Sequence, residues 1–390
     1  MKNILFLCNA DEGWMGGVYY VRNMIFALLQ NDAARKNLNI YILAKNCVAE
    51  AFRDLEKEES VHIVISDQLT TLQKIRKKIK KIWYVNIRKI AVDRNLLLNV
   101  VERCKIDYIY PLQYRADKYV DKGIMWIADF QHIHYPEFFQ GSELQEREML
   151  FEYIARNHKK LVLSSNSAKR DYLSKYPQYA KNVYVIPFVS AIDSRIIHED
   201  GVKAAQEKYG ISGQYFLISN QFWKHKNHKI VLEALNYAKR QQGVEMSVVC
   251  TGFFSDYRDV AYTEALKEYI ADNHLEDNFR ILGLIDREDQ LQLMKGCIAV
   301  IQPSLFEGWG TVVEDAKTLK KKIIMSDIDV HLEQKNADCI LYERHDSQQL
   351  AKIMMQCWET GVEKEVQSKY DYVKQASEYG KLFYDMLMSE

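Results

Sequence analysis

The sequence lacks an excess of either charge. Its 53 lysines and arginines balance 53 aspartates and glutamates, so the formal net charge is zero. Because nucleic-acid-binding proteins usually carry a basic surplus that meets the phosphates, this balance does not indicate a nucleic-acid partner. The 48% of hydrophobic and 27% of charged residues are instead typical of a soluble globular protein.

Long apolar runs and paired-cysteine motifs are absent as well. No run approaches the roughly 18 apolar residues of a membrane-spanning helix. The N-terminal apolar run, Ile4 to Cys8, is too short for the core of a signal peptide. The seven cysteines are scattered and none shows a CxxC spacing. We therefore expect reduced thiols and a cytoplasmic protein.

What the sequence does contain is a repeated alternation of strand and helix patterns. A chain of 390 residues exceeds one comfortable core, so two domains are expected. Alternating strands and helices predict parallel, doubly wound sheets with a ligand cleft at the carboxyl ends of the strands. The expected strands are 3–8, 38–43, 61–65, 108–110, 124–127, 160–164 and 183–186, then 214–219, 246–251, 280–282, 299–302, 322–326 and 339–342.

The pattern restarts after a proline-marked crossing point at residues 185–189. We therefore predict a first α/β domain over residues 1–187 and a second over 188–367. The last segment, about 368–390, is predicted to be helical.

The most informative stretch spans residues 303–317. A carboxylate precedes a Gly-aromatic-Gly turn, a helix follows, and a second carboxylate lies eight positions after the first. A glycine turn at a helix start offers free backbone N–H groups, which suit an anionic or hydroxyl-rich ligand such as a sugar nucleotide. The candidate residues here are Glu307, Gly308, Trp309, Gly310, Thr311, Glu314 and Asp315.

Two further segments could meet a phosphate. Gly16 and Gly17 follow the first strand and open the first helix, where a ligand can approach backbone amides. A tight turn without a ligand explains this spacing equally well. Lys224 and Lys226 lie after the first strand of the second half, where a diphosphate leaving group would need positive charge. A solvated basic loop is the alternative.

Polar side chains also follow two strands of the first half. Asp129, His132 and His134 lie close together in the segment 126–139 and are candidates for contact with a sugar or an acceptor hydroxyl. The alternative for the histidines is a structural role. Ser167 is predicted to cap the helix that follows residue 164.

These segments together resemble the retaining glycosyltransferases of family 4, which have the GT-B fold. The family pattern is Glu, seven residues, Glu around Glu-Gly-Phe-Gly; here Asp315 replaces the second Glu, with Glu314 beside it. The resemblance implies that Glu307 and the amides of residues 308–311 hold the donor sugar. It also implies that Asp315 or Glu314 meets the ribose, and that the backbone around Ile285 meets the base.

The resemblance also assigns the remaining candidates. Lys226 matches the lysine that holds the diphosphate, but Gln221 stands where the family has an arginine, so Lys224 is the candidate to compensate. Asp129 matches the acid of a His-Asp pair whose histidine is absent here. His132 is our candidate for that role, with His134 as the alternative. Gly16 and Gly17 correspond to a loop near the diphosphate and the acceptor.

The implied activity is transfer of a sugar from a nucleotide-sugar to a saccharide or lipid-linked acceptor, in cell-surface polysaccharide or glycoconjugate biosynthesis. No metal or other cofactor is expected, and the Asp327-x-Asp329 pattern is interpreted as carrying no metal. The terminal helix is expected to cross back onto the first domain. Basic residues within Lys74–Trp83 would contact anionic lipid at the inner face of the cell membrane, unless they form a solvated face.

Two alternatives remain open. One is a sugar-nucleotide 2-epimerase, an isomerase with the same fold that needs no acceptor. The other is a catalytically degenerate partner subunit. The substitutions at residues 128, 221 and 315 favour the second alternative, and the spacing from Glu307 to Asp315 speaks against the first.

Overall fold

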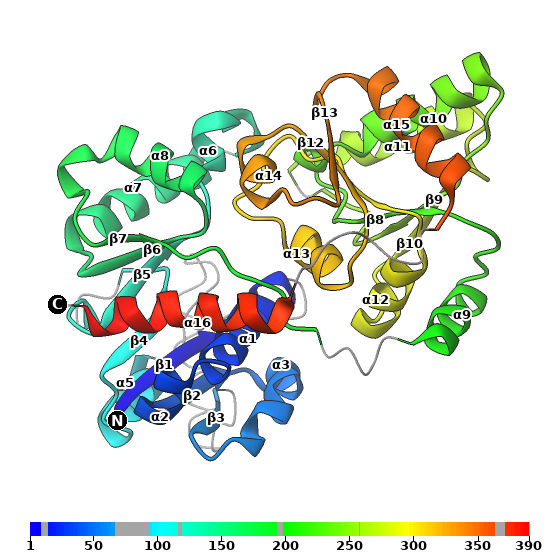
Figure 1. The fold of residues 1–390 in the computed structure, drawn as a ribbon. Helices are drawn as coiled ribbons and strands as arrows, with labels where there is room; N and C mark the ends of the chain where they lie inside the picture. The colour runs from blue at the N-terminus through cyan, green and yellow to red at the C-terminus, as the bar shows by residue number, and fades with distance from the viewer. Residues whose placement is uncertain are drawn as a thin grey trace, which may run out of the picture.

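The computed structural model describes residues 1–8, 15–66, 94–115, 119–139, 141–192, 198–256, 258–362 and 371–389. Within them the chain forms two parallel sheets, each covered by helices on both faces, as Figure 1 shows. The GT-B arrangement of two α/β domains that the sequence predicts is therefore present. No helix in the described ranges is long and apolar enough to cross a membrane.

The first sheet has seven strands in the order β3-β2-β1-β4-β5-β6-β7, all parallel. Successive side chains of β1 point to opposite faces, so Ile4 and Phe6 pack in one core cluster and Leu5 and Leu7 in the other. The strands are β1 (Lys2–Cys8), β2 (Leu38–Ala44), β3 (Val61–Ile65), β4 (Tyr108–Leu112), β5 (Gly123–Ile127), β6 (Lys160–Leu163) and β7 (Val183–Val185).

Helices cover both faces of this sheet. One face carries α1 (Met15–Leu29), α2 (Asp32–Asn37), α3 (Asn46–Ala49) and α16 (Tyr372–Met388). The other carries α5 (Arg94–Arg103), α7 (Gly141–Asn157) and α8 (Asn166–Lys175). The short helix α6 (Gln131–His134) follows β5.

The second sheet has six parallel strands in the order β10-β9-β8-β11-β12-β13. The strands are β8 (Phe216–Ser219), β9 (Val248–Thr251), β10 (Phe279–Gly283), β11 (Val300–Gln302), β12 (Ile323–Ser326) and β13 (Cys339–Tyr342). One face packs on α10 (His228–Gln242), α11 (Val260–Asp272) and α15 (Ser347–Thr360), and the other on α9 (Glu199–Lys208), α12 (Arg287–Gly296) and α13 (Thr311–Thr318). The short helix α14 (Asp329–Gln334) follows β12.

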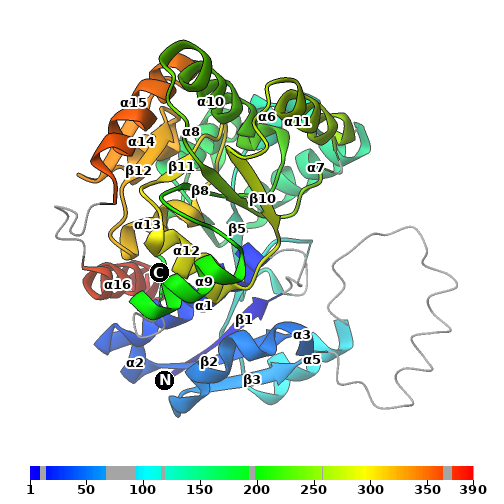
Figure 2. The same cartoon turned by 90° about the vertical axis from the view of Figure 1, so that its right-hand side faces the viewer.

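The C-terminal helix returns to the first domain. In Figure 1 and Figure 2, α16 lies along α1, far from the second sheet that precedes it in sequence. The contact is close at Gly380, where an added Cβ would lie 2.1 Å from the carbonyl oxygen of Ala27. Tyr379 and Phe383 are buried in the same core as Phe6. The chain thus crosses between the domains twice, and the exact division at residue 187 stays a prediction.

Candidate functional site

A cavity of about 210 Å³ lies where the carboxyl ends of the two sheets face each other. Most of its wall follows directly from strand ends, which is where open parallel sheets bind ligands. Lining residues lie at the ends of β5 and β11 or follow β1, β5, β6, β7, β8 and β11. They are Gly16, Tyr20, Trp126, Ala128, Asp129, Ser164, Phe188, Asn220, Lys226, Gln302, and Glu307 through Val312.

Glu307 is the most constrained carboxylate of this cavity. Its Oε1 accepts hydrogen bonds from Lys226 Nζ (2.7 Å), Gln302 Nε2 (2.9 Å) and Ser304 Oγ (2.7 Å). Its side chain is 8% exposed and that of Lys226 is 15% exposed. Within the described residues no hydrogen bond reaches the other carboxylate oxygen, Oε2. Glu307 is thus held as a charged acceptor with one oxygen left for a ligand hydroxyl.

Two helices begin at the cavity. Gly16 lies in the first turn of α1, and Thr311 is the first residue of α13. The first N–H groups of a helix have no intrahelical partner and carry partial positive charge, so both ends favour an anion. The N–H of Gly310 is already used, because it donates to Gln334 Oε1 (3.1 Å). Gly17, in contrast to Gly16, is buried.

The glycine at 308 is required by the close approach of the two domains. A Cβ at this position would lie 2.5 Å from the carbonyl oxygen of Ala128 and 2.9 Å from Cβ of Asp129. The His-to-Ala difference at residue 128 that the sequence shows therefore lies directly against the turn after Glu307.

Aromatic rings form the floor of the cavity. Tyr20 stacks on Trp126 with ring centroids 4.2 Å apart, and Phe188 meets Tyr20 edge-on at 5.4 Å. Trp309 donates from its Nε1 to the carbonyl oxygen of Phe188 (2.9 Å). Aromatic faces suit the C–H surface of a sugar ring. Tyr20, Trp126 and Phe188 were not predicted from the sequence, because buried aromatic residues within apolar segments are typical of a protein core.

The basic residues of the 219–228 segment separate in the structure. Lys226 lines the cavity, whereas Lys224 is half exposed and donates from Nζ to Asp259 Oδ2 (2.9 Å). Gln221 is half buried beside Gly252, where a Cβ would meet the backbone nitrogen of Gln221 at 3.0 Å. Neither Lys224 nor Gln221 is among the residues that line the cavity. The pairing of Lys224 with Asp259 speaks against its compensating for the missing arginine.

The candidates of the 126–139 segment also separate. Asp129 lines the cavity and accepts from Arg147 Nη2 (2.5 Å). His132 turns away into the core of the first domain, with its Nε2 3.2 Å from Glu148. Burial, reinforced by Arg147, lowers the pKa of His132 to about 4, so it is neutral at pH 7. His134 is exposed and pairs with Asp171 (2.9 Å).

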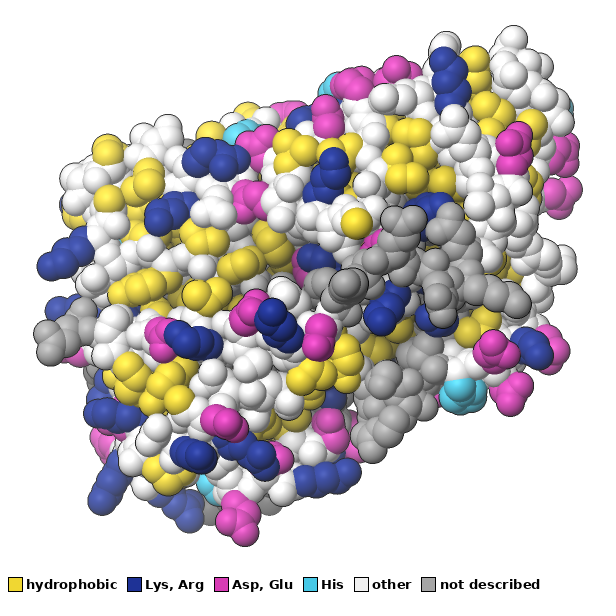
Figure 3. All heavy atoms as spheres, viewed as in Figure 1, with side chains coloured by type: hydrophobic (Ala, Val, Ile, Leu, Met, Phe, Trp, Pro, Cys, Tyr) yellow, Lys and Arg dark blue, Asp and Glu magenta, His cyan; other side chains and the backbone are white. Residues whose placement is uncertain are grey.

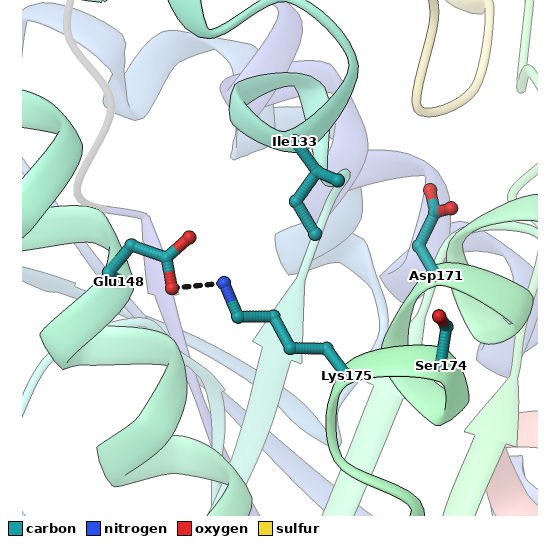
Figure 4. A pocket seen from close by; sticks show the side chains of 5 residues that line it. All are labelled: Ile133, Glu148, Asp171, Ser174 and Lys175. Carbon is teal, nitrogen blue, oxygen red and sulfur yellow. Dashed lines mark hydrogen bonds and ion pairs between the residues drawn. The ribbon is translucent and has the colours of Figure 1, made fainter.

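A second hollow, of about 360 Å³, lies on the first domain beside these histidines. Figure 4 shows Glu148 paired with Lys175 at its centre and Ile133, Asp171 and Ser174 around them. Although it is larger than the cavity at Glu307, its charged residues are paired: Glu148 with Lys175, and Asp171 with His134. No helix of eight residues or more begins among its lining residues. We therefore assign the chemistry to the cavity at Glu307.

The two carboxylates proposed for the ribose are both engaged. Glu314 is buried and accepts from Lys317 Nζ (3.0 Å) and Gln334 Nε2 (2.8 Å). Asp315 Oδ1 accepts from Arg287 Nη2 (2.6 Å) and Ser190 Oγ (2.5 Å). Arg287 was not among the residues singled out from the sequence, because its partners Asp315 and Tyr19 are distant from it in the chain. Ile285 is half buried against the core of the second domain.

The cap of α8 is Ser165 and not Ser167. The helix begins two residues earlier than expected, and Ser165 Oγ accepts from the N–H of Ala168 (3.0 Å). The N–H of Ser167 lies within the first turn and donates to Oε1 of Glu333 in the other domain (2.6 Å). The expectation failed because either serine satisfies the capping pattern, and tertiary contacts decide between them.

Both carboxylates of the Asp-x-Asp pattern are paired with arginines. Asp327 Oδ1 accepts from Arg344 Nε (2.8 Å), and Asp329 Oδ2 from Arg170 Nη2 (2.5 Å). Among the described residues no group of three or more His, Cys, Asp or Glu side chains is placed to hold a metal ion. The basic stretch Lys74–Trp83 lies outside the described residues. On the face seen in Figure 3, basic and acidic side chains are interspersed over both domains.

The chain is similar to one protein family and to several solved structures. Residues 203–375 match the family model of glycosyl transferases group 1. The Anabaena protein HepE, solved with UDP and glucose, is 17% identical over 99% of this chain and 95% of that chain, with a TM-score of 0.60. A glycosyltransferase from Rickettsia africae is 15% identical over 100% of this chain and 99% of that chain, with a TM-score of 0.61.

A third neighbour has a different activity in its name. The UDP-GlcNAc 2-epimerase from Methanocaldococcus jannaschii is 14% identical over 99% of both chains, with a TM-score of 0.52. No curated protein matches the chain closely enough to count as a relative. At these identities the solved structures show the shared GT-B fold and do not by themselves distinguish the activities.

Proposed function

From the match of residues 203–375 to the family model of glycosyl transferases group 1, we propose that this protein is a retaining, metal-independent glycosyltransferase of family 4. It would move a sugar from a nucleotide-sugar to a saccharide or lipid-linked acceptor in cell-surface polysaccharide or glycoconjugate biosynthesis. The observation that carries the proposal is the cavity at Glu307, which joins a locked carboxylate, a lysine and two helix N-termini in one small space.

The diphosphate and the sugar of a donor each have a matching group in this cavity. The diphosphate lies between the first turns of α1 and α13, where Lys226 adds a positive charge. The sugar lies beside Glu307, whose free Oε2 accepts from a hydroxyl, with its C–H face on the rings of Tyr20 and Trp126. The structure of HepE with UDP and glucose, a protein of the same fold, supports this class of ligand.

The chemistry needs no nucleophile from the protein. The acceptor hydroxyl oxygen attacks the anomeric carbon on the face from which the diphosphate leaves. The departing oxygen takes the hydroxyl proton, so the products are a glycoside of retained configuration and a nucleoside diphosphate. Glu307 is held by three donors, one of which, Lys226, is also its ion-pair partner, and this suits a fixed binding role. The positive groups around the diphosphate stabilise the charge that develops on it.

A metal is not required in this scheme, because Lys226 and the two helix ends supply the positive charge. The arginine pairing of Asp327 and Asp329 supports the interpretation that this pattern carries no metal. Incubation of donor and acceptor with and without EDTA tests this point. Equal rates are expected, and restoration of a lost rate by added Mg²⁺ or Mn²⁺ would contradict it.

The first experiment is a thermal-shift and calorimetry panel with UDP-, GDP-, ADP- and dTDP-sugars. A single clear binder is expected, and it then serves as donor in an acceptor screen with the anomeric configuration read by NMR. Conversion of the donor to its epimer without an acceptor would favour the 2-epimerase, whose fold this chain shares. Binding by none of the sugars would favour a degenerate partner subunit.

We further propose a cytoplasmic protein that touches anionic lipid through Lys74–Trp83. Co-sedimentation with vesicles of phosphatidylcholine, with and without phosphatidylglycerol, tests this contact. Binding only to the anionic vesicles is expected. Equal and negligible binding to both would remove the membrane contact and leave the transferase proposal untouched.

A further inference from the structure

Arg287 lies between the two domains, beside Asp315, the carboxylate that was expected to meet the ribose. It is the first residue of α12, and its Nη2 donates to Asp315 Oδ1 on α13 (2.6 Å). Its guanidinium carbon lies 4.9 Å from the centre of the Tyr19 ring on α1. Nη1 donates to Gln290 Oε1 (3.0 Å), which fixes the plane of the group. The Arg287 guanidinium is thus held between α12, α13 and α1.

Asp315 itself is poorly placed to meet a ligand. Its side chain is 4% exposed, whereas that of Arg287 is 25% exposed. The same Oδ1 also accepts from Ser190 in the segment that crosses between the domains (2.5 Å). Thr318 Oγ1 donates to the carbonyl oxygen of Ser190 (3.3 Å), so this segment is tied to α13 at two points. Asp315 is one methylene shorter than the Glu of the family pattern, and its carboxylate stays within this buried network.

Tyr19 and Asp315, the two partners of Arg287, each lie about one helical turn from a residue that lines the cavity. Tyr19 follows Gly16 by three positions on α1, and Asp315 follows Val312 by three positions on α13, and both Gly16 and Val312 line the cavity. Three helical residues rise by roughly 4.5 Å. A nucleotide-sugar with its sugar at Glu307 and its diphosphate between the two helix ends can therefore reach Arg287 with its nucleoside.

We propose that Arg287 is the residue that contacts the ribose of the donor, and that Asp315 is a positioning residue that holds it. This inference rests on the proposed function. The guanidinium has only N–H donors, so it donates to the ribose hydroxyl oxygens where a carboxylate would have accepted from them. The Tyr19 ring and Asp315 keep the guanidinium in one plane, which reduces the entropy that ordering on binding would cost.

The test is calorimetry of UDP, 2′-deoxy-UDP, 3′-deoxy-UDP and inorganic pyrophosphate with the full chain. If the panel above names another base, its nucleoside diphosphate and deoxy forms replace these probes. The variants are Arg287→Gln, Arg287→Lys, Asp315→Asn and the double variant Arg287→Gln/Asp315→Asn. Arg280→Gln is the matched control, since Arg280 donates to a carbonyl oxygen on the surface, at Gly210.

Arg287→Gln should weaken UDP by about 10- to 100-fold, as expected for loss of hydrogen bonds from a charged group. It should also remove the penalty for omitting a ribose hydroxyl while leaving pyrophosphate binding unchanged. A merely structural role would not produce that selectivity. Arg287→Lys should recover part of the loss, Arg280→Gln should match the wild type, and Asp315→Asn should add nothing to Arg287→Gln.

Two outcomes would overturn the inference alone. One is wild-type affinity and a wild-type deoxy penalty in Arg287→Gln. The other is a deoxy penalty that disappears in Asp315→Asn but persists in Arg287→Gln, which would make Asp315 the ribose ligand. Failure of the wild type to bind any nucleoside diphosphate would instead overturn the proposed function, and this inference with it.

Discussion

Replacing Glu307 by Gln changes the charge at the cavity and almost nothing of the side chain's shape. The amide of Gln can still accept from Gln302 and Ser304, but it no longer neutralises Lys226, which is 15% exposed. A hydrogen bond from a ligand hydroxyl to a charged acceptor contributes about 1.5–3 kcal/mol. Loss of that contribution in the transition state lowers kcat/KM by roughly 10- to 150-fold.

The same change should spare nucleotide binding. In the wild type the ammonium of Lys226 lies 2.7 Å from Glu307 Oε1, so the carboxylate competes with a diphosphate for it. Without the carboxylate, Lys226 is available to the diphosphate. We therefore expect the Kd for UDP to stay the same or to fall, while transfer drops. Opposite effects on binding and rate distinguish a sugar-holding acid from a general loss of folding.

The assay combines initial rates of transfer with calorimetry of UDP on the same preparation. Breaking a buried ion pair costs up to about 3–5 kcal/mol, and partial exposure of Lys226 reduces this, so thermal unfolding is recorded first. Glu148→Gln is the matched control, because Glu148 also pairs with a lysine, Lys175, but outside this cavity. Full transfer activity in Glu307→Gln, or a UDP affinity that falls in parallel with the rate, would refute the role.

Three further outcomes follow from the same geometry. Lys226→Ala should weaken UDP by about 10- to 100-fold and uridine hardly at all in calorimetry; equal losses would remove Lys226 from the diphosphate. Gly308→Ala should abolish transfer and enlarge the radius of gyration in small-angle scattering, because its Cβ would meet the Ala128 carbonyl at 2.5 Å; Gly141→Ala, with nothing within 4 Å, is the control. Burial lowers the pKa of His331 to about 4. As the pH is lowered, the unfolded chain binds the proton before the folded chain does, so the free energy of unfolding should decrease from about pH 6.5 to pH 4. Urea unfolding at several pH values measures this fall, and an equally steep one in His331→Gln would assign it elsewhere.

The fold was predictable because its signals are local. Every expected strand occurs, with ends that differ by at most two residues, since buried parallel strands read as short apolar runs between turns. Phe279–Gly283, for example, was expected as 280–282, and the first helix begins at Met15, next to the Gly16 and Gly17 that were expected to open it. Strand order was not predicted in detail, because it depends on pairings between distant segments that sequence periodicity does not contain.

The candidate site was predictable where one continuous segment carries it. Glu307 through Thr311 and Lys226 lie on the cavity as expected, because a glycine turn and a strand end fix their directions locally. His132 was expected near the ligand but lies in the core, because the turn of α6 that follows Asp129 directs its ring inwards. Arg287 could not be found, since its partners Tyr19 and Asp315 come from helices far away in sequence.

The contacts across the cavity also limit how the protein can work. Glu333 of α14 accepts from the N–H groups of Asn166 (2.8 Å) and Ser167 (2.6 Å), and so holds the start of α8 to the second domain. The bond from Asn166 is exposed and that from Ser167 is half-buried, so water weakens both below the about 1.5–3 kcal/mol of a shielded hydrogen bond to a charged group. Gly308 packs against the Ala128 backbone on the wall of the cavity, so separation of the domains would widen the cavity for a donor. Under the proposed function, a donor that prefers the closed arrangement would shift the two domains towards it, and this would couple exclusion of water to the arrival of substrate.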